Sequence, residues 1–137
     1  MASPRSADAH AAVIQGEPAL WWFQHLMWVG IVANIVIALI SITWPADVLA
    51  FVSLEPAQPL VWPRFSAFLL ILLSIFYVPA AIDPVRNRFA AVFAVICRFG
   101  GVAFFALVGG RYILFGLFDL AFGLPQAILL WLGRAKP

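Results

Sequence analysis

The chain of 137 residues has few charged side chains: 10% of its residues are Asp, Glu, Lys or Arg, whereas 65% are apolar. Soluble domains are about half apolar and about a quarter charged, so this chain has too few polar side chains to cover a water-soluble surface. The same figures exclude intrinsic disorder, because disordered chains are rich in charge and poor in apolar residues. The composition indicates an integral membrane protein.

Cysteine, basic clusters and catalytic motifs are also scarce. Cys97 is the one cysteine, so the sequence has neither an internal disulfide nor a multi-cysteine metal or iron–sulfur site. The net charge of +2 comes without a dense group of Lys and Arg, which argues against a nucleic-acid partner. The sequence has no Gly-rich phosphate loop, no His-rich metal motif and no Ser-His-Asp set in a plausible spacing. It therefore offers no catalytic residue and no metal ligand, and an enzyme is the less favoured class.

Four long apolar runs predict four membrane helices, at about residues 20–43, 64–82, 89–109 and 111–132. One crossing needs about 20 residues, so the four helices form a single membrane domain at 20–132, between an N-terminal segment at 1–19 and a tail at 133–137. Pro84 should end the second helix near Ile82, because a residue before proline is disfavoured in the helical region. Gly109-Gly110-Arg111 predicts a tight turn between the last two helices. The expected fold class is an all-α, four-transmembrane-helix antiparallel bundle.

Small residues and one proline mark the packing of these helices. Gly116 and Gly123 are seven residues apart, so they share one face of the fourth helix and permit a close approach by a neighbouring helix. Pro125 removes one backbone hydrogen bond and predicts a kink in the same helix.

Lysine and arginine near the helix ends predict the orientation. The inner side would carry Arg5, Arg86, Arg88, Arg134 and Lys136, and the outer side would carry Arg64 and Arg111. Five cations against two favour cytoplasmic N- and C-termini by the positive-inside rule. We therefore expect segments 1–19 and 133–137 in the cytoplasm, in a multi-pass protein of a bacterial inner (plasma) membrane.

The first external loop, Pro45 to Pro59, is not purely polar. Residues 47–54 include enough apolar positions for a short helix with an apolar face, which we expect to lie on the outer membrane interface. A docking surface for a partner, or a lid over the bundle, is the alternative interpretation.

Two charged residues fall at membrane depth, where each costs at least about 2.5–3.5 kcal/mol on insertion scales. Arg98 lies about 16 Å and Asp119 about 12 Å from the same outer end, at 1.5 Å per residue. Their helices are joined by the tight turn, so they are neighbours, and we predict an Arg98–Asp119 ion pair. Asn34 and Ser74 lie at about the same depth and complete a predicted polar network. Ligand binding and a purely structural role both remain open for it.

A second polar group, His25, Tyr77 and Gln126, is predicted nearer the inner face. A haem held by two histidines is not expected, because the membrane runs contain no second histidine. A haem held by a single histidine, a lipid, or a quinone that accepts a hydrogen bond from His25 or Tyr77 is a candidate ligand, and no cofactor is identified. The alternative is an interfacial histidine among the aromatic anchors Trp21, Trp22 and Trp28.

The first functional hypothesis is a non-catalytic accessory or structural subunit of a larger membrane complex, with a respiratory or other oxidoreductase complex as one candidate. It rests on the missing catalytic set, the small mass outside the bilayer and the many aromatic side chains, 13 Phe and 6 Trp. The alternative is a small transporter or a quinone- or lipid-binding protein that uses an intramembrane Arg98–Asp119 site. A membrane enzyme with Asp119 or His25 in acid–base work is a third hypothesis. Expected partners are the lipid bilayer and a membrane-protein partner or a second copy of the chain.

Overall fold

The computed structural model describes residues 17–133, and every regular element in that range is helical. The elements are α2 (Pro18–Thr43), α3 (Pro45–Phe51), α4 (Val61–Ile82), α5 (Arg88–Val108), the 3-10 turn η1 (Gly110–Tyr112) and α6 (Ile113–Leu132). The expected all-α fold with four long helices is confirmed. Residues 1–16 and 134–137, which make up most of the predicted N-terminal segment and tail, lie outside the described residues.

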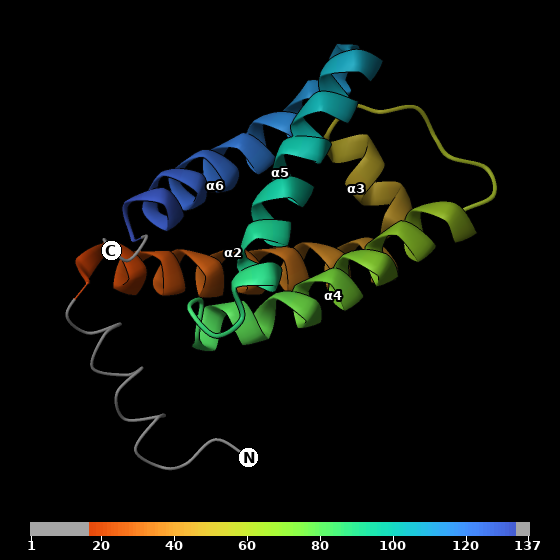
Figure 1. Ribbon diagram of the computed structural model, residues 1–137. Helices are drawn as coiled ribbons and strands as arrows, with labels where there is room; N and C mark the ends of the chain where they lie inside the picture. Colours follow the sequence, from red (N-terminus) through yellow and green to blue (C-terminus); the bar gives the residue numbers. More distant parts are fainter. Residues whose placement is uncertain (1–16, 134–137) are drawn as a thin grey trace.

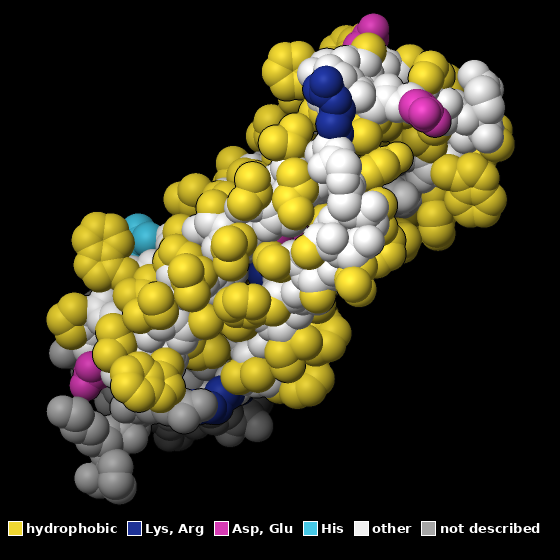
Figure 2. Space-filling model, turned by 90° about the horizontal axis from the view of Figure 1, so that it is seen from above, with side chains coloured by type: hydrophobic (Ala, Val, Ile, Leu, Met, Phe, Trp, Pro, Cys, Tyr) yellow, Lys and Arg dark blue, Asp and Glu magenta, His cyan; other side chains and the backbone are white. Residues whose placement is uncertain are grey.

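The four long helices are each long and apolar enough to cross a membrane, with η1 and α6 counted together as one span. Large apolar side chains such as Val32, Leu72 and Ile96 point outward from them. In Figure 2, hydrophobic side chains cover most of the visible face, and charged side chains lie mainly at the two ends. Such a surface suits contact with lipid, and the chain is a small polytopic membrane protein.

Local sequence signals explain where the helices begin and end. The Asp83 carboxylate accepts hydrogen bonds from the backbone N–H groups of Val85 and Arg86, so the chain turns sharply after α4. The helix ends at Ile82, as predicted. Gly109 and Gly110 form the predicted turn with φ angles of +73° and +61°, which glycine adopts without steric cost.

The second long helix differs from the prediction at its start. It begins at Val61, not near residue 64, and Pro63 lies inside its first turn. Proline is tolerated there because the first N–H groups of a helix have no intrahelical partner. Within the expected external loop, α3 is the predicted short helix.

The long helices form two antiparallel pairs, α2 with α4 and α5 with α6 (Figure 1). The α2–α4 pair is tied at both ends by side-chain hydrogen bonds, from Gln24 to the carbonyl of Ile82 and from Arg64 to the carbonyl of Ile42. At one end of the bundle the two pairs come together, where Gly133 packs against Leu20. We call this the closed end. The pairs diverge toward α3, which we call the open end.

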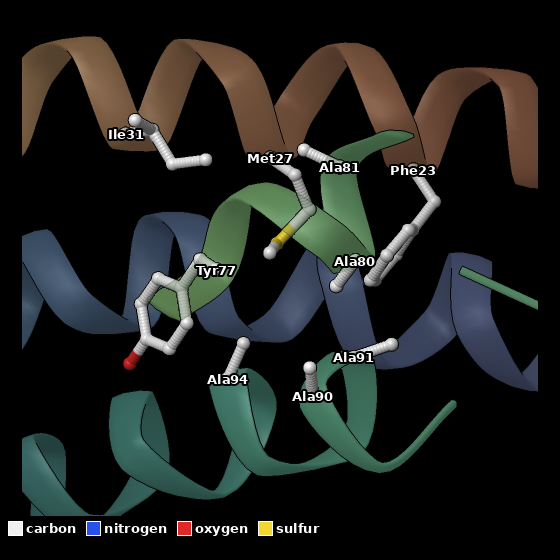
Figure 3. Packing of buried hydrophobic residues seen from close by; sticks show 9 residues of the cluster. All are labelled: Phe23, Met27, Ile31, Tyr77, Ala80, Ala81, Ala90, Ala91 and Ala94. Atoms are coloured by element: carbon white, nitrogen blue, oxygen red, sulfur yellow. The ribbon is translucent and has the colours of Figure 1, made fainter. Parts of the chain in front are cut away.

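The hydrophobic core fills the half of the bundle near the closed end. Its buried members come from three helices and are Phe23, Met27, Ile31, Tyr77, Ala80, Ala81, Ala90, Ala91 and Ala94 (Figure 3). The three alanines of α5 leave room for the larger side chains of α2 and α4, so the two helix pairs pack tightly there.

Glycine sets the close approach of α6 to α5. A Cβ atom added at Gly123 would lie 2.8 Å from the Cβ of Arg98, and one added at Gly116 would lie 3.3 Å from the Cβ of Phe105. Both glycines are buried. The prediction that they share a face against a neighbouring helix is confirmed.

Candidate functional site

The predicted ion pair between Arg98 on α5 and Asp119 on α6 is present in the bundle. Arg98 Nη1 donates a hydrogen bond to Asp119 Oδ1 over 2.8 Å. The Arg98 side chain is 6% exposed and the Asp119 side chain 20% exposed. The pair is therefore removed from bulk lipid, and its aspartate is the more accessible partner.

The guanidinium of Arg98 also reaches α2 and the aromatic face of α6. Its Nη2 atom lies 3.4 Å from Oδ1 of Asn34, which makes this the longer and weaker of its two hydrogen bonds. The guanidinium carbon Cζ lies 5.2 Å from the ring centre of Phe122 and 5.6 Å from that of Phe118, within the range of cation–π attraction. One side chain thus connects three helices.

Asn34 is only partly satisfied by this arrangement. Its side chain is 1% exposed, and its amide nitrogen has no hydrogen-bond partner among residues 17–133. A buried donor without an acceptor is costly, typically by about 1–3 kcal/mol.

Three glycines make the space for these polar side chains. A Cβ atom at Gly101 would overlap the carboxylate of Asp119, and one at Gly30 would lie 3.2 Å from Nη2 of Arg98, while Gly123 faces the Arg98 stem. Sequence reasoning did not single out Gly30 or assign Gly101 to this site. The usable signal was their spacing: Gly30 lies four residues before Asn34, and Gly101 three residues after Arg98, on the same helix face in each case.

A cavity of about 840 Å³ leads from these polar residues to the open end of the bundle. Asn34, Arg98 and Asp119 lie at its deep end, and Trp44 and Phe51 lie at the α3 end. Trp44 directly follows α2 and lies ten positions after Asn34, which corresponds to a rise of about 15 Å along the helix axis. Between these ends the walls come from four helices and are mainly apolar, with Ile37, Ile40, Leu70, Phe105, Leu114, Phe115 and Phe118 among them.

Ser74 makes its hydrogen bond within its own helix, and its place in the predicted polar network stays a prediction. The serine is fully buried, but its hydroxyl donates to the carbonyl of Leu70 in its own helix over 2.8 Å. Serine in a helix readily bonds the carbonyl four residues earlier, and that bond satisfies the hydroxyl without a neighbouring helix.

The second predicted polar group is divided between two environments. His25 lies on the exposed face of α2, with Nδ1 2.8 Å from the carbonyl oxygen of Trp21 and its ring 3.8 Å from the Trp21 ring. Tyr77 is buried in the hydrophobic core, and Gln126 is buried with an Oε1 atom that has no partner within the described range. None of the three lines the 840 Å³ cavity. A site formed by His25 together with Tyr77 remains a sequence prediction.

No protein-family model, no curated protein and no solved structure matches this chain. The function is therefore argued from the cavity and the residues that line it.

Proposed function

We propose that the protein binds a lipophilic small molecule in the cavity between its two helix pairs. The observation that carries this proposal is the combination of a large apolar cavity with convergent polar groups at its deep end. Ligand cavities typically measure about 300–1,000 Å³ and have apolar walls with a few placed polar groups, and this cavity falls in that range.

The unsatisfied amide of Asn34 supports ligand binding over a purely structural role for the network. An ion pair that only fixes helix packing needs no open space beside it. Here Asn34, Arg98 and Asp119 all border the cavity, and the buried amide nitrogen of Asn34 has no acceptor within residues 17–133. A ligand head group at this position would supply that acceptor.

The predicted orientation gives the ligand an entry side. With both chain ends cytoplasmic, the open end of the bundle and α3 face the outer leaflet. Phe51 of α3 is the most exposed of the large apolar side chains described, and it lies beside the cavity mouth. A lipophilic molecule dissolved in the outer leaflet would pass this residue on entering.

An accessory subunit of a larger membrane complex, such as a respiratory or other oxidoreductase complex, remains a second proposal. It rests on the outward aromatic and aliphatic side chains, including Trp22, Phe89 and Leu107, which suit a neighbouring helix as well as lipid. The two proposals are compatible, because a subunit of such a complex can hold a quinone or a lipid.

A blocked cavity tests the proposed function. Ile37 lines the cavity, whereas the adjacent Val36 faces away from it, so Ile37→Trp and Val36→Trp form a matched pair on α2. The full chain is purified in mild detergent, and the small molecules retained by it are measured by native mass spectrometry. We expect the parent and Val36→Trp to retain a small lipophilic molecule and Ile37→Trp to lose at least about nine tenths of it. Equal retention by both variants, or none by the parent, would refute ligand binding in this cavity.

A further inference from the structure

The polar atoms at the deep end of the cavity differ in accessibility. Asp119 keeps 20% of its side chain exposed, and only its Oδ1 accepts a hydrogen bond in the described part of the chain. Arg98 is 6% exposed and Asn34 is 1% exposed. Of the three polar residues at the deep end, Asp119 is therefore the most accessible, and its carboxylate can only accept hydrogen bonds; Ser41, Ser66 and Asp47 line the cavity elsewhere.

The charge balance selects against a charged head group. Arg98 and Asp119 neutralise each other, so the deep end carries no net charge to offset that of a ligand. A carboxylate or phosphate head would meet Asp119, the accessible partner, as a like charge in a low-dielectric site. An ammonium head would have to compete with Arg98 for the same carboxylate after losing its own hydration. The favoured head group is uncharged.

The hydrogen-bonding groups define this head group further. The Asp119 carboxylate can accept a further hydrogen bond beside that from Arg98, and the amide nitrogen of Asn34 has no acceptor among residues 17–133. Asn34 and Asp119 contact two nitrogens of the same guanidinium, so their side chains lie close together. A hydroxyl group both donates and accepts, so its chemistry matches this pair of side chains.

We propose that the ligand is an uncharged, single-chain amphiphile with a hydroxyl head, bound with the hydroxyl at Asp119 and Asn34 and the tail toward α3. This inference rests on the proposed function and names the ligand class. The head-inward direction follows from the walls, which are mainly apolar from Leu70 and Phe115 out to Trp44. A long-chain alcohol and an alkyl phenol share this chemistry.

A series of ligands with one chain and four heads tests the inference on the unmodified protein. Dodecanol, dodecyl methyl ether, dodecanoic acid and dodecylamine are titrated into the full chain in lipid nanodiscs, and binding is measured by native mass spectrometry. Dodecanol should bind about 10- to 100-fold more tightly than the ether, which cannot donate to the carboxylate. It should also bind more tightly than the acid and the amine. An ether that binds as well as the alcohol, or a charged head that binds more tightly, would overturn the inference.

Two protein variants separate the head-group inference from the proposed function. Asn34→Ala removes the amide donor and should weaken the binding of dodecanol and of the ether alike, because both oxygens accept hydrogen bonds, whereas Ser74→Ala, buried but bonded within its own helix, should leave both affinities unchanged. An unchanged affinity of Asn34→Ala for dodecanol would contradict the assigned position of the hydroxyl. If instead all four ligands bind equally to the parent and to Ile37→Trp, the cavity itself is not the binding site and the proposed function fails. An alkyl phenol that binds like dodecanol would confirm that the hydroxyl group decides recognition.

Discussion

Removal of either partner of the Arg98–Asp119 pair should destabilise the bundle, and removal of both should cost less than the worse single change. Asp119→Leu leaves a guanidinium that is 6% exposed with one hydrogen bond of 3.4 Å and two aromatic rings. Loss of one partner of a buried pair typically costs about 3–5 kcal/mol, because the remaining charge is uncompensated. Two opposite charges about 4 Å apart interact by about 4 kcal/mol at an effective dielectric constant of 20, which agrees with that range.

The two single variants should differ in how much they lower the free energy of unfolding. Arg98→Met retains most of the arginine stem beside Gly123, and the remaining Asp119 borders the cavity, where it can take up a proton and become neutral. A guanidinium cannot lose its charge in this way. We therefore expect Arg98→Met to cost less than Asp119→Leu, and the double variant to recover about 2–4 kcal/mol relative to the sum of the two.

Reversible unfolding in mixed detergent micelles, followed by tryptophan fluorescence, gives the four free energies of this cycle. Arg111→Met is the matched control, because Arg111 is exposed in η1 and its replacement should change the free energy of unfolding by less than about 0.5 kcal/mol. Additive single effects, with no recovery in the double variant, would show that the pair contributes no coupling and would refute this reasoning.

Three further predictions follow from the glycines and the orientation. Gly101→Ala should destabilise the bundle by more than about 1 kcal/mol, because its Cβ would overlap the Asp119 carboxylate. Gly100→Ala meets open space and should be neutral, or slightly stabilising because alanine favours a helix more than glycine does. Equal melting temperatures of the two variants would contradict this packing. Gly116→Leu should separate α6 from α5 and lower the thermal stability, and a melting curve like that of the parent would show that this approach is not needed. In a Cys97→Ala background, a membrane-impermeant thiol reagent added to intact cells should label Glu55→Cys but not Arg86→Cys, and the opposite pattern would reverse the predicted orientation.

The sequence predicted the ion pair because the turn between its helices is so short. With η1 directly between α5 and α6, depth along the chain was enough to bring Arg98 and Asp119 to the same level of adjacent helices. Depth alone did not predict the hydrogen-bond partner of Ser74. Successive side chains point about 100° apart around a helix, and a serine hydroxyl can bond within its own helix. Depth did not predict the direction of the His25 side chain either, which lies on the exposed face of α2.

The cavity was beyond sequence reasoning because it depends on how two helix pairs diverge. In the closed half, Ala90 and Ala94 of α5 allow a tight approach to α2 and α4. In the open half, bulky Phe105 and Phe115 line the space between the pairs. The sequence shows where small and large residues alternate along each helix. Which neighbouring helix these residues face depends on the tertiary arrangement.

Photolabelling with a dodecanol that carries a diazirine beside its hydroxyl tests the central claim most directly. The account predicts crosslinks to the peptides containing Asn34 and Asp119 at the deep end of the cavity, suppressed by excess dodecanol and by Ile37→Trp but not by Val36→Trp. The contrary result is a spread of crosslinks over outward side chains such as Val32 and Leu72, unchanged by competitor or by either variant. It would show that the alcohol samples only the lipid-facing surface, and it would contradict a hydroxyl-binding site at the ion pair.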